Sequence, residues 1–323
     1  MNVKKRLLEI LEANKGQALS GVRLAEALDV SRNAVWKAIE ALRKDGYRIT
    51  AIINKGYCLT AENDMLSAEG IRPFLVRPEQ VPVLTVCASL ASTNQTAKAL
   101  AVNDAAHGTV VASDCQTEGK GRYGRAFFSP AGSGLYMSLI WRPDDLNETR
   151  PELLTAYAAV CVCEAIEAVT EKMPSIKWVN DIFLDGKKIG GILTEAMTDF
   201  ESRRLQWVVL GVGLNVTEPA GGFPQELQGT AGSVYGGAEA NRNRLAAEII
   251  NRLLREEGLP NAVQVYEAYR KRLFAIGETV IVKESGAEYN AVALDVDEAG
   301  RLVLQKADGE RHVLAVGEIS VYI

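Results

Sequence analysis

The chain has 323 residues, of which 47% are hydrophobic and 24% are charged, so it is long enough for two or three domains with a sizeable buried core. The N-terminal apolar run is too short for a signal peptide and no stretch is long enough to cross a membrane, so we expect a cytoplasmic protein. With two histidines a histidine-rich metal site is excluded, and the five cysteines, which form no C-x-x-C pair, are expected to be buried free thiols.

The net charge of −5 is distributed unevenly along the chain. Residues 1–60 carry 11 lysines and arginines against 6 acidic residues, a net charge of +5. Residues 61–323 carry 25 against 35, a net charge of −10. We therefore expect residues 1–60 to bind an anion that residues 61–323 do not bind, and DNA is such an anion.

Three short helices are predicted in residues 1–46, with Ser20 and Ser31 as the expected N-caps of the second and third. Two β-prone runs, 47–53 and 57–60, follow around Asn54-Lys55-Gly56 and predict a hairpin. This order is typical of a winged helix-turn-helix, and the other interpretation is a small helical domain whose surface is basic. In the winged module the third helix enters the major groove and the hairpin lies near a phosphate. The side chains expected at DNA are Ser31, Arg32, Asn33, Lys37 and Lys55.

The rest of the chain divides into three parts. Residues 63–80 carry charges and two prolines and predict a linker with a short helix. From residue 81 onward strands are expected at 84–87, 109–113, 135–141, 176–184, 188–195 and 207–210, and helices at 92–101, 151–170, 242–257 and 262–273. Strands paired through hairpins, with helices on one side, indicate an α+β domain around a mixed sheet. After Gly277 only short strands remain, the last running from 311 to the end, which predicts a small SH3-like β-barrel.

The stretch G-K-G-R-Y-G-R places Gly119, Gly121 and Gly124 at the G-x-G-x-x-G spacing of a dinucleotide fingerprint. Such a fingerprint needs a helix directly behind the third glycine, and the residues after Gly124 cannot form a long one, so this interpretation is rejected. The loop instead interleaves its glycines with the cations Lys120, Arg122 and Arg125. On its own the loop fits a solvated loop as well as one that binds a phosphate or carboxylate.

Two other segments place polar residues where structure alone does not require them. Asn180 and Asp181 interrupt an apolar predicted strand, and Lys188 follows a D-G turn just before Gly190-Gly191. A second cluster, 92–95, gathers Ser, Thr, Asn and Gln at a helix start, where capping would explain Ser92 but not all four residues. Both segments favour a binding site.

Five segments, in order and in spacing, are similar to those of the biotin protein ligases: S-T-N-Q (92–95), Q-T-E-G-K-G-R-Y-G-R-A-F-F-S-P (116–130), K-W-V-N-D (177–181), K-I-G-G-I-L-T-E (188–195) and G-V-G-L-N (211–215). With the winged module in front and the SH3-like domain behind, the whole chain resembles the bifunctional biotin ligases that also repress the biotin operon. The expected domains are 1–62 for DNA binding, 81–274 for catalysis with a biotin/lipoate-ligase-like mixed sheet, and 275–323 for the SH3-like part.

The resemblance implies a two-step reaction. Biotin and ATP with Mg²⁺ give biotinyl-5'-AMP, and biotin then passes to a lysine of a biotin carboxyl carrier protein, belonging to acetyl-CoA carboxylase or pyruvate carboxylase. It also implies operator DNA as a partner and a homodimer promoted by biotinyl-5'-AMP, with magnesium arriving on ATP rather than at a dedicated protein site.

The site residues follow from the same motifs. Those implied for biotin are Ser92, Thr93, Asn94, Gln116, Lys120, Gly121, Arg122 and Lys188, and those implied for ATP or the adenylate are Gly119, Arg122, Arg125, Asn180, Lys188 and Asn215. Lys188, Arg122 and Lys120 are the expected catalytic cations. Asp181 either helps the acceptor lysine lose its proton or only orients biotin or that lysine.

The sequence departs from the family pattern at two positions. Lys120 replaces the first arginine of the glycine loop, which keeps the charge but loses the planar guanidinium, and Val179 replaces a proline. Two alternatives stay open: a biotin-sensing transcription factor without ligase activity, and a lipoate-protein ligase. Lipoate-protein ligases carry a glycine-rich motif that ends in His-Asp. No such motif surrounds His107 or His312 in this sequence.

Overall fold

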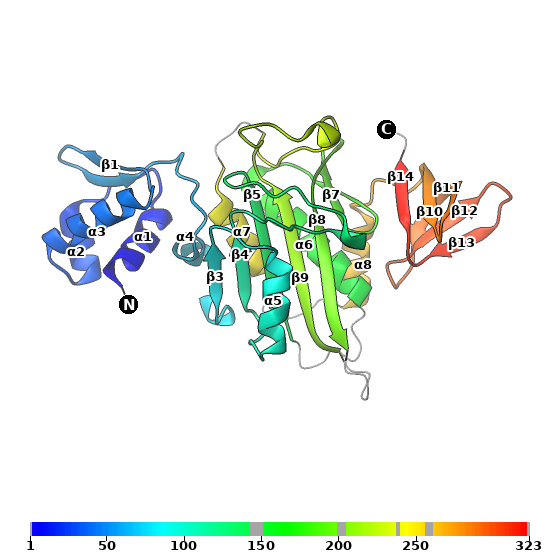
Figure 1. Cartoon of the computed structure of the whole chain (residues 1–323), viewed down its shortest axis with the longest axis horizontal. Helices are drawn as coiled ribbons and strands as arrows, with labels where there is room; N and C mark the ends of the chain where they lie inside the picture. The colour runs from blue at the N-terminus through cyan, green and yellow to red at the C-terminus, as the bar shows by residue number, and fades with distance from the viewer. Residues whose placement is uncertain (1, 143–150, 199–204, 237–239, 256–260, 322–323) are drawn as a thin grey trace.

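The computed structural model describes residues 2–142, 151–198, 205–236, 240–255 and 261–321, and its three domains follow one another in a row (Figure 1). The N-terminal domain contains α1 (Val3–Ala13), α2 (Gly21–Leu28), α3 (Arg32–Lys44) and the hairpin of β1 (Ile49–Ile52) and β2 (Gly56–Leu59). The Ser20 and Ser31 hydroxyls accept from the backbone N–H of Arg23 and Ala34, which confirms both predicted caps. The winged helix-turn-helix prediction is confirmed.

The segment behind the hairpin packs closely between the first two domains. It contains α4 (Ala68–Ile71) and the 3₁₀ turns η1 (Arg72–Phe74) and η2 (Pro78–Gln80). Asn63 is buried and its side-chain oxygen accepts from the Arg48 N–H at 2.9 Å. Ile71 is fully buried in the core of the central domain. This packed segment therefore holds the N-terminal domain against the central domain.

The central domain is built on a seven-stranded sheet in the order β3-β4-β5-β9-β8-β7-β6. Its strands are β3 (Leu84–Cys87), β4 (Val110–Ser113), β5 (Gly134–Trp141), β6 (Ser175–Lys177), β7 (Asp181–Leu184), β8 (Lys187–Thr198) and β9 (Leu205–Asn215). The pair β3 and β4 is parallel, and the other neighbours are antiparallel. The mixed sheet of the prediction is confirmed.

Helices cover both faces of this sheet, so the expectation of helices on one side is wrong. One face carries α5 (Thr93–Val102), and the other carries α6 (Pro151–Thr170), α7 (Arg242–Leu253) and α8 (Ala262–Arg270) (Figure 1). The helix α6 is long and apolar enough to span a membrane, but 67% of its most apolar window is buried inside the protein. It is the central helix of the core, where Leu154, Ala158 and Val162 are fully buried.

The predicted strand 176–184 is broken in two. Lys177 pairs with Asp181 across a tight turn, so β6 and β7 run antiparallel and Asn180 lies in the turn between them. The Trp178–Val179 peptide bond is cis. Tertiary contacts hold this turn, because the Tyr269 hydroxyl donates to the Val179 carbonyl at 2.8 Å and the Trp178 indole donates to the Gly300 carbonyl at 2.9 Å.

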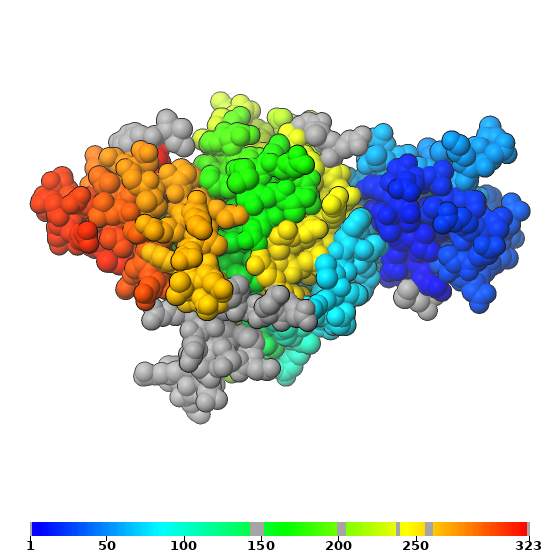
Figure 2. Space-filling view, turned by 180° about the vertical axis from the view of Figure 1, so that it is seen from behind, coloured from blue at the N-terminus to red at the C-terminus, as the bar shows by residue number. Residues whose placement is uncertain are grey.

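The C-terminal domain is a five-stranded antiparallel sheet in the order β13-β12-β11-β10-β14. Its strands are β10 (Thr279–Glu284), β11 (Ala287–Val296), β12 (Leu302–Lys306), β13 (Arg311–Leu314) and β14 (Glu318–Val321). The last predicted strand is thus split into two, and β14 crosses to the far side of β10. Figure 2 shows this domain and the N-terminal domain at opposite ends of the molecule. Its buried residues, such as Val280 and Leu304, join the core of the central domain.

Candidate active site

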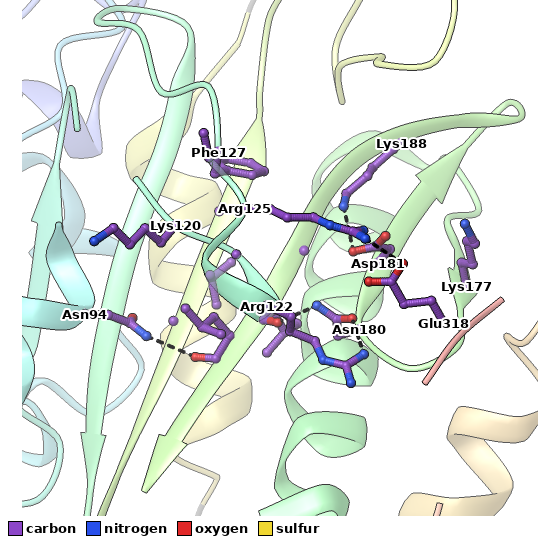
Figure 3. Close-up of a pocket in the computed structure, with 18 of the residues that line it drawn as sticks. Asn94, Lys120, Arg122, Arg125, Phe127, Lys177, Asn180, Asp181, Lys188 and Glu318 are labelled. Atoms are coloured by element: carbon purple, nitrogen blue, oxygen red, sulfur yellow. Dashed lines mark hydrogen bonds and ion pairs between the residues drawn. The ribbon is translucent and has the colours of Figure 1, made fainter. Parts of the chain in front are cut away.

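A cavity of about 290 Å³ opens on the α5 side of the central sheet. The start of α5, the glycine loop, β7, β8 and β9 line it, and β14 of the C-terminal domain contributes Glu318, Ile319 and Ser320. Figure 3 shows Lys188 and Arg125 directed toward the carboxylates of Asp181 and Glu318, whereas Lys120 lies apart from them on the side of Asn94. The cavity gathers most of the predicted site residues: Ser92, Thr93, Asn94, Gln116, Lys120, Gly121, Arg122, Arg125, Asn180, Asp181 and Lys188.

One end of the cavity is a network of neutral polar groups. Ser92 caps α5 through a hydrogen bond from the Gln95 N–H. Thr93 donates to the Gln116 side-chain oxygen from its backbone N–H at 2.9 Å and from its hydroxyl at 3.2 Å. The Gln116 amide nitrogen donates in turn to the Ser129 hydroxyl at 3.2 Å. Thr93 and Gln116 therefore share one hydrogen-bonded framework with Ser129, which was not singled out from the sequence.

Asn94 is held from several directions. Its nitrogen donates to the Leu193 carbonyl at 3.2 Å and to the Glu195 carboxylate at 2.8 Å, and its oxygen lies 2.6 Å from the Ser138 hydroxyl. A Cβ atom on Gly211 of β9 would lie 2.1 Å from this oxygen, so only glycine lets Asn94 sit against the strand. The G-V-G-L-N segment was identified from the sequence by its resemblance to the family, but the contact that requires its first glycine is seen only in the structure.

The glycine loop folds back on itself and does not open a long helix, in agreement with the rejection of a dinucleotide fingerprint. The Gly121 N–H donates to the Arg125 carbonyl at 2.8 Å, and the Phe127 N–H donates to the Gly119 carbonyl at 2.8 Å. Between them lies a short 3₁₀ turn, η3 (Arg122–Gly124). Lys120 is exposed and lines the cavity, whereas Gly119 is buried beneath the loop, outside the cavity lining.

The other end of the cavity carries the charges. Lys188 forms an ion pair with Asp181 at 2.7 Å, and Arg125 pairs with Glu318 at 2.7 Å (Figure 3). The Arg122 guanidinium carbon lies 5.0 Å from the centroid of the Tyr123 ring, and one of its nitrogens lies 3.5 Å from the Asn180 side-chain oxygen. These contacts hold Lys188, Arg125 and Arg122 in the lining of the cavity.

Lys177, the first residue of the K-W-V-N-D motif, joins this group. Burial lowers its pKa, and the carboxylate of Asp181 counters that effect. The Lys188 ammonium is a second, smaller cause that lowers the pKa of Lys177, since two like charges lie close together. The site therefore concentrates positive charge at one point, which attracts an anion.

A second cavity of about 600 Å³ adjoins the first and shares Phe127, Lys177, Asp181 and Lys188 with it. Its other walls are largely apolar or aromatic and include Phe128, Phe183, Asn215, Phe223 and Leu227. The Lys188 N–H donates to the Thr230 carbonyl at 2.9 Å, so the segment 221–233 runs beside β8. No residue of this segment could be chosen as a ligand contact from the sequence alone.

Lys188 thus lies where a polar cavity and an apolar cavity meet. The polar cavity, the cations around Lys188 and the apolar cavity follow one another in space. This order fits a ligand with a polar head, an anionic centre and a flat apolar ring system. Within the described residues no group of three or more His, Cys, Asp or Glu side chains is arranged to hold a metal ion.

The fold and the site define a ligase domain of the biotin/lipoate type, joined to a DNA-binding domain. Residues 86–215 match the biotin/lipoate A/B protein ligase family, residues 3–58 an HTH domain, and residues 275–322 the biotin protein ligase C terminal domain. The bifunctional ligase/repressor BirA of Bacillus spizizenii is 35% identical over 321 residues, which cover 96% of each chain. The chain belongs to this family of bifunctional biotin ligases and repressors.

More distant proteins show the same architecture. The bifunctional ligase/repressor BirA of Escherichia coli is 29% identical over 312 residues, covering 95% of this chain and 94% of that protein. The biotin protein ligase from Aquifex aeolicus, solved in complex with biotin and ATP, matches with a TM-score of 0.61 and 24% identity, over 75% of this chain and 99% of that one. The latter likeness shows the fold alone.

Proposed function

We propose that this protein activates biotin with ATP, transfers it to a lysine of a biotin carboxyl carrier protein, and represses the biotin operon through its winged helix-turn-helix. The observation that carries the ligase assignment is Lys188, paired with Asp181, at the junction of the polar and apolar cavities. The relative from Bacillus spizizenii, which is similar over nearly the whole chain, is named for both activities.

In the first step a carboxylate oxygen of biotin attacks the α-phosphorus of ATP, and the bond to pyrophosphate breaks. The polar network around Asn94 and Gln116 would take the head of biotin, and the apolar cavity would take adenine. Lys188, Arg122 and Lys120 bring the two anions together and stabilise the charge that develops in the transition state. Magnesium would enter on the phosphates of ATP.

In the second step the amine of the acceptor lysine attacks the carbonyl carbon of biotinyl-5'-AMP, and AMP leaves with its phosphate oxygen. A solvent-exposed lysine amine has a pKa of about 10.4, so it must lose a proton first. Asp181 is the carboxylate at the reacting centre, and its ion pair with Lys188 gives it a further task, which is to orient that cation in the first step.

The DNA-binding part of the proposal rests on the exposed face of α3. Arg32, Asn33 and Lys37 are exposed there, and Lys55 is exposed at the tip of the hairpin. Trp36 lies among them with half of its surface exposed, and the sequence had not singled it out. An amphipathic ring beside cations suits contact with base edges. A homodimer formed with bound biotinyl-5'-AMP would place two such helices on an inverted repeat.

The ligase assignment is tested by incubating the protein with ATP, Mg²⁺, biotin and an apo carrier domain, followed by a streptavidin blot. Lys188→Ala should abolish labelling, whereas Lys187→Ala, which removes the exposed lysine next to it, should retain labelling. Absence of labelling by the wild type would instead favour a biotin-sensing transcription factor without ligase activity. Labelling of a lipoyl domain with lipoate, but not with biotin, would favour a lipoate ligase.

The repressor assignment needs a separate experiment, because the catalytic test does not involve DNA. A mobility-shift titration on the promoter of a biotin-synthesis operon should show tighter binding when biotin and ATP are added. Arg32→Ala should weaken the shift without changing carrier labelling. Equal binding with and without biotin and ATP would reject the biotin-responsive part of the proposal.

A further inference from the structure

The Asn94 side chain makes contacts that leave only one way to place its amide. An amide nitrogen carries two hydrogens, and both are used here, by the Leu193 carbonyl and by the Glu195 carboxylate. Both partners only accept hydrogen bonds, so the nitrogen of Asn94 must face them and its oxygen must face away. Since Asn94 is 6% exposed, water cannot replace these partners freely.

Glu195 is itself held in place by a lysine. Lys98, one turn after Asn94 on α5, places its ammonium 2.6 Å from the second carboxylate oxygen of Glu195. The two side chains are about one-third exposed, so the pair lies at the edge of the buried network. A carboxylate paired with an ammonium accepts hydrogen bonds and does not donate them.

The orientation of the Asn94 amide decides whether it offers a ligand a hydrogen-bond acceptor or a donor. The Asn94 oxygen has two lone pairs, and within the described residues the Ser138 hydroxyl, at 2.6 Å, is the group hydrogen-bonded to it. This oxygen lies against Gly211, and Asn94 and Gly211 both line the cavity, so the second lone pair is left for an N–H donor there. If the amide turned over, Asn94 would offer its NH₂ group there instead. An N–H of the ligand would then face another donor and could not form a hydrogen bond.

We propose that Glu195, held by Lys98, is a positioning residue that fixes the Asn94 amide with its oxygen toward the ligand, and so makes the site selective for a cyclic urea N–H. This inference rests on the proposed function for the identity of the ligand. The Glu195 carboxylate lies behind Asn94 and acts through it. A neutral side chain of the same shape at position 195 removes the stronger of the two constraints and leaves only the Leu193 carbonyl, because the NH₂ group of glutamine can donate to a turned Asn94.

The test compares equilibrium binding of biotin and of biotin methylated on a ureido nitrogen, measured by calorimetry with wild type, Glu195→Gln and Lys98→Met. Glu195→Gln should weaken biotin binding at least tenfold and reduce the preference for biotin over the methylated analogue. Lys98→Met should shift both quantities in the same direction by a smaller factor. Val102→Ala, which changes an exposed side chain near the far end of α5, should match the wild type.

Kinetics separate a positioning role from a structural one. Glu195→Gln should raise KM for biotin while KM for ATP and kcat at saturating biotin stay close to wild type. An unchanged preference between biotin and its methylated analogue would overturn the inference, as would parallel losses in both KM values and kcat. If wild type bound no biotin, the proposed function itself would fail and this inference with it.

Discussion

Arg125 of the glycine loop donates to the Glu318 carboxylate of β14 at 2.7 Å, so the loop is tied to the last strand of another domain. Lys120 and Ala126 form a β-bridge on either side of the η3 turn, which brings Arg125 into reach of β14. Because β14 also lines the first cavity, the C-terminal domain forms part of the active site.

Glu318→Arg should therefore slow formation of biotinyl-5'-AMP by several fold, since it repels the loop from the position in which the cavity is complete. The exposed ion pair contributes at most about 1 kcal/mol to stability, so the melting temperature should change little. The double variant Arg125→Glu, Glu318→Arg reverses the pair and should recover part of the rate lost in Glu318→Arg. A pyrophosphate-release assay measures the rate, and a single variant as fast as wild type would show that the contact has no part in catalysis.

Arg242 joins two segments at the boundary between the N-terminal and central domains. Its guanidinium and backbone N–H bind Asp64, in the segment behind the hairpin, and the same guanidinium reaches Asp114, two residues before Gln116. Arg242 is 4% exposed. Burial raises the pKa of Asp64, and the charge of Arg242 works against that rise.

Arg242→Met leaves both carboxylates without their cation, and the loss of one partner from a buried pair costs about 3–5 kcal/mol. We expect a lower midpoint in urea unfolding followed by tryptophan fluorescence. Arg244→Met, which removes an exposed arginine from the same helix, is the control and should unfold like wild type. Equal midpoints for both variants would mean that the contacts of Arg242 do not stabilise the protein.

The local elements of this protein were predictable because their signals are local. Ser20, Ser31 and Ser92 each cap the helix that begins at the next residue, and a cap needs only a hydroxyl a few residues before the N–H it accepts. The wing hairpin likewise depends on a short turn, in which Asn54 and Gly56 have positive φ angles.

What the sequence did not predict depends on distant partners. The apolar run 176–184 looks like one strand, but Tyr269 and Gly300 hold a turn in its middle. Glu318 enters the site because β14 pairs with β10, and no local pattern connects it with the glycine loop. The five motifs could be joined into one site only through their resemblance to a family, since nothing local brings residues 92–95 beside β8.

Gly211 offers a test of the packing beneath Asn94. A methyl group there would lie 2.1 Å from the Asn94 side-chain oxygen, well inside contact distance, so Gly211→Ala should push Asn94 out of the polar network. Biotin affinity, measured by calorimetry, should fall on the order of tenfold or more, because one misplaced hydrogen bond to a buried group costs about 1–3 kcal/mol. Gly221→Ala is the control, since a methyl group at Gly221 meets nothing within 4 Å. Wild-type affinity in Gly211→Ala would contradict this account of the site.

The five cysteines differ in exposure, and the expectation that all are buried is wrong for two of them. Cys58, Cys161 and Cys163 are buried, whereas Cys87 and Cys115 are half-buried. Burial raises the pKa of the Cys161 and Cys163 thiols to about 12. Because the thiolate is the reactive form, these two thiols should react slowly at pH 8.

A thiol-disulfide reagent at pH 8 should therefore react quickly with Cys87 and Cys115 in the native protein and with all five thiols in denaturant. Replacing both half-buried cysteines by serine should remove the fast phase. The labelling of Cys161 and Cys163 should stay slow over the pH range in which the protein is folded, because burial raises the pKa of both thiols. Fast reaction of Cys161 or Cys163 at pH 8, identified by mass spectrometry, would contradict the burial of α6 in the core.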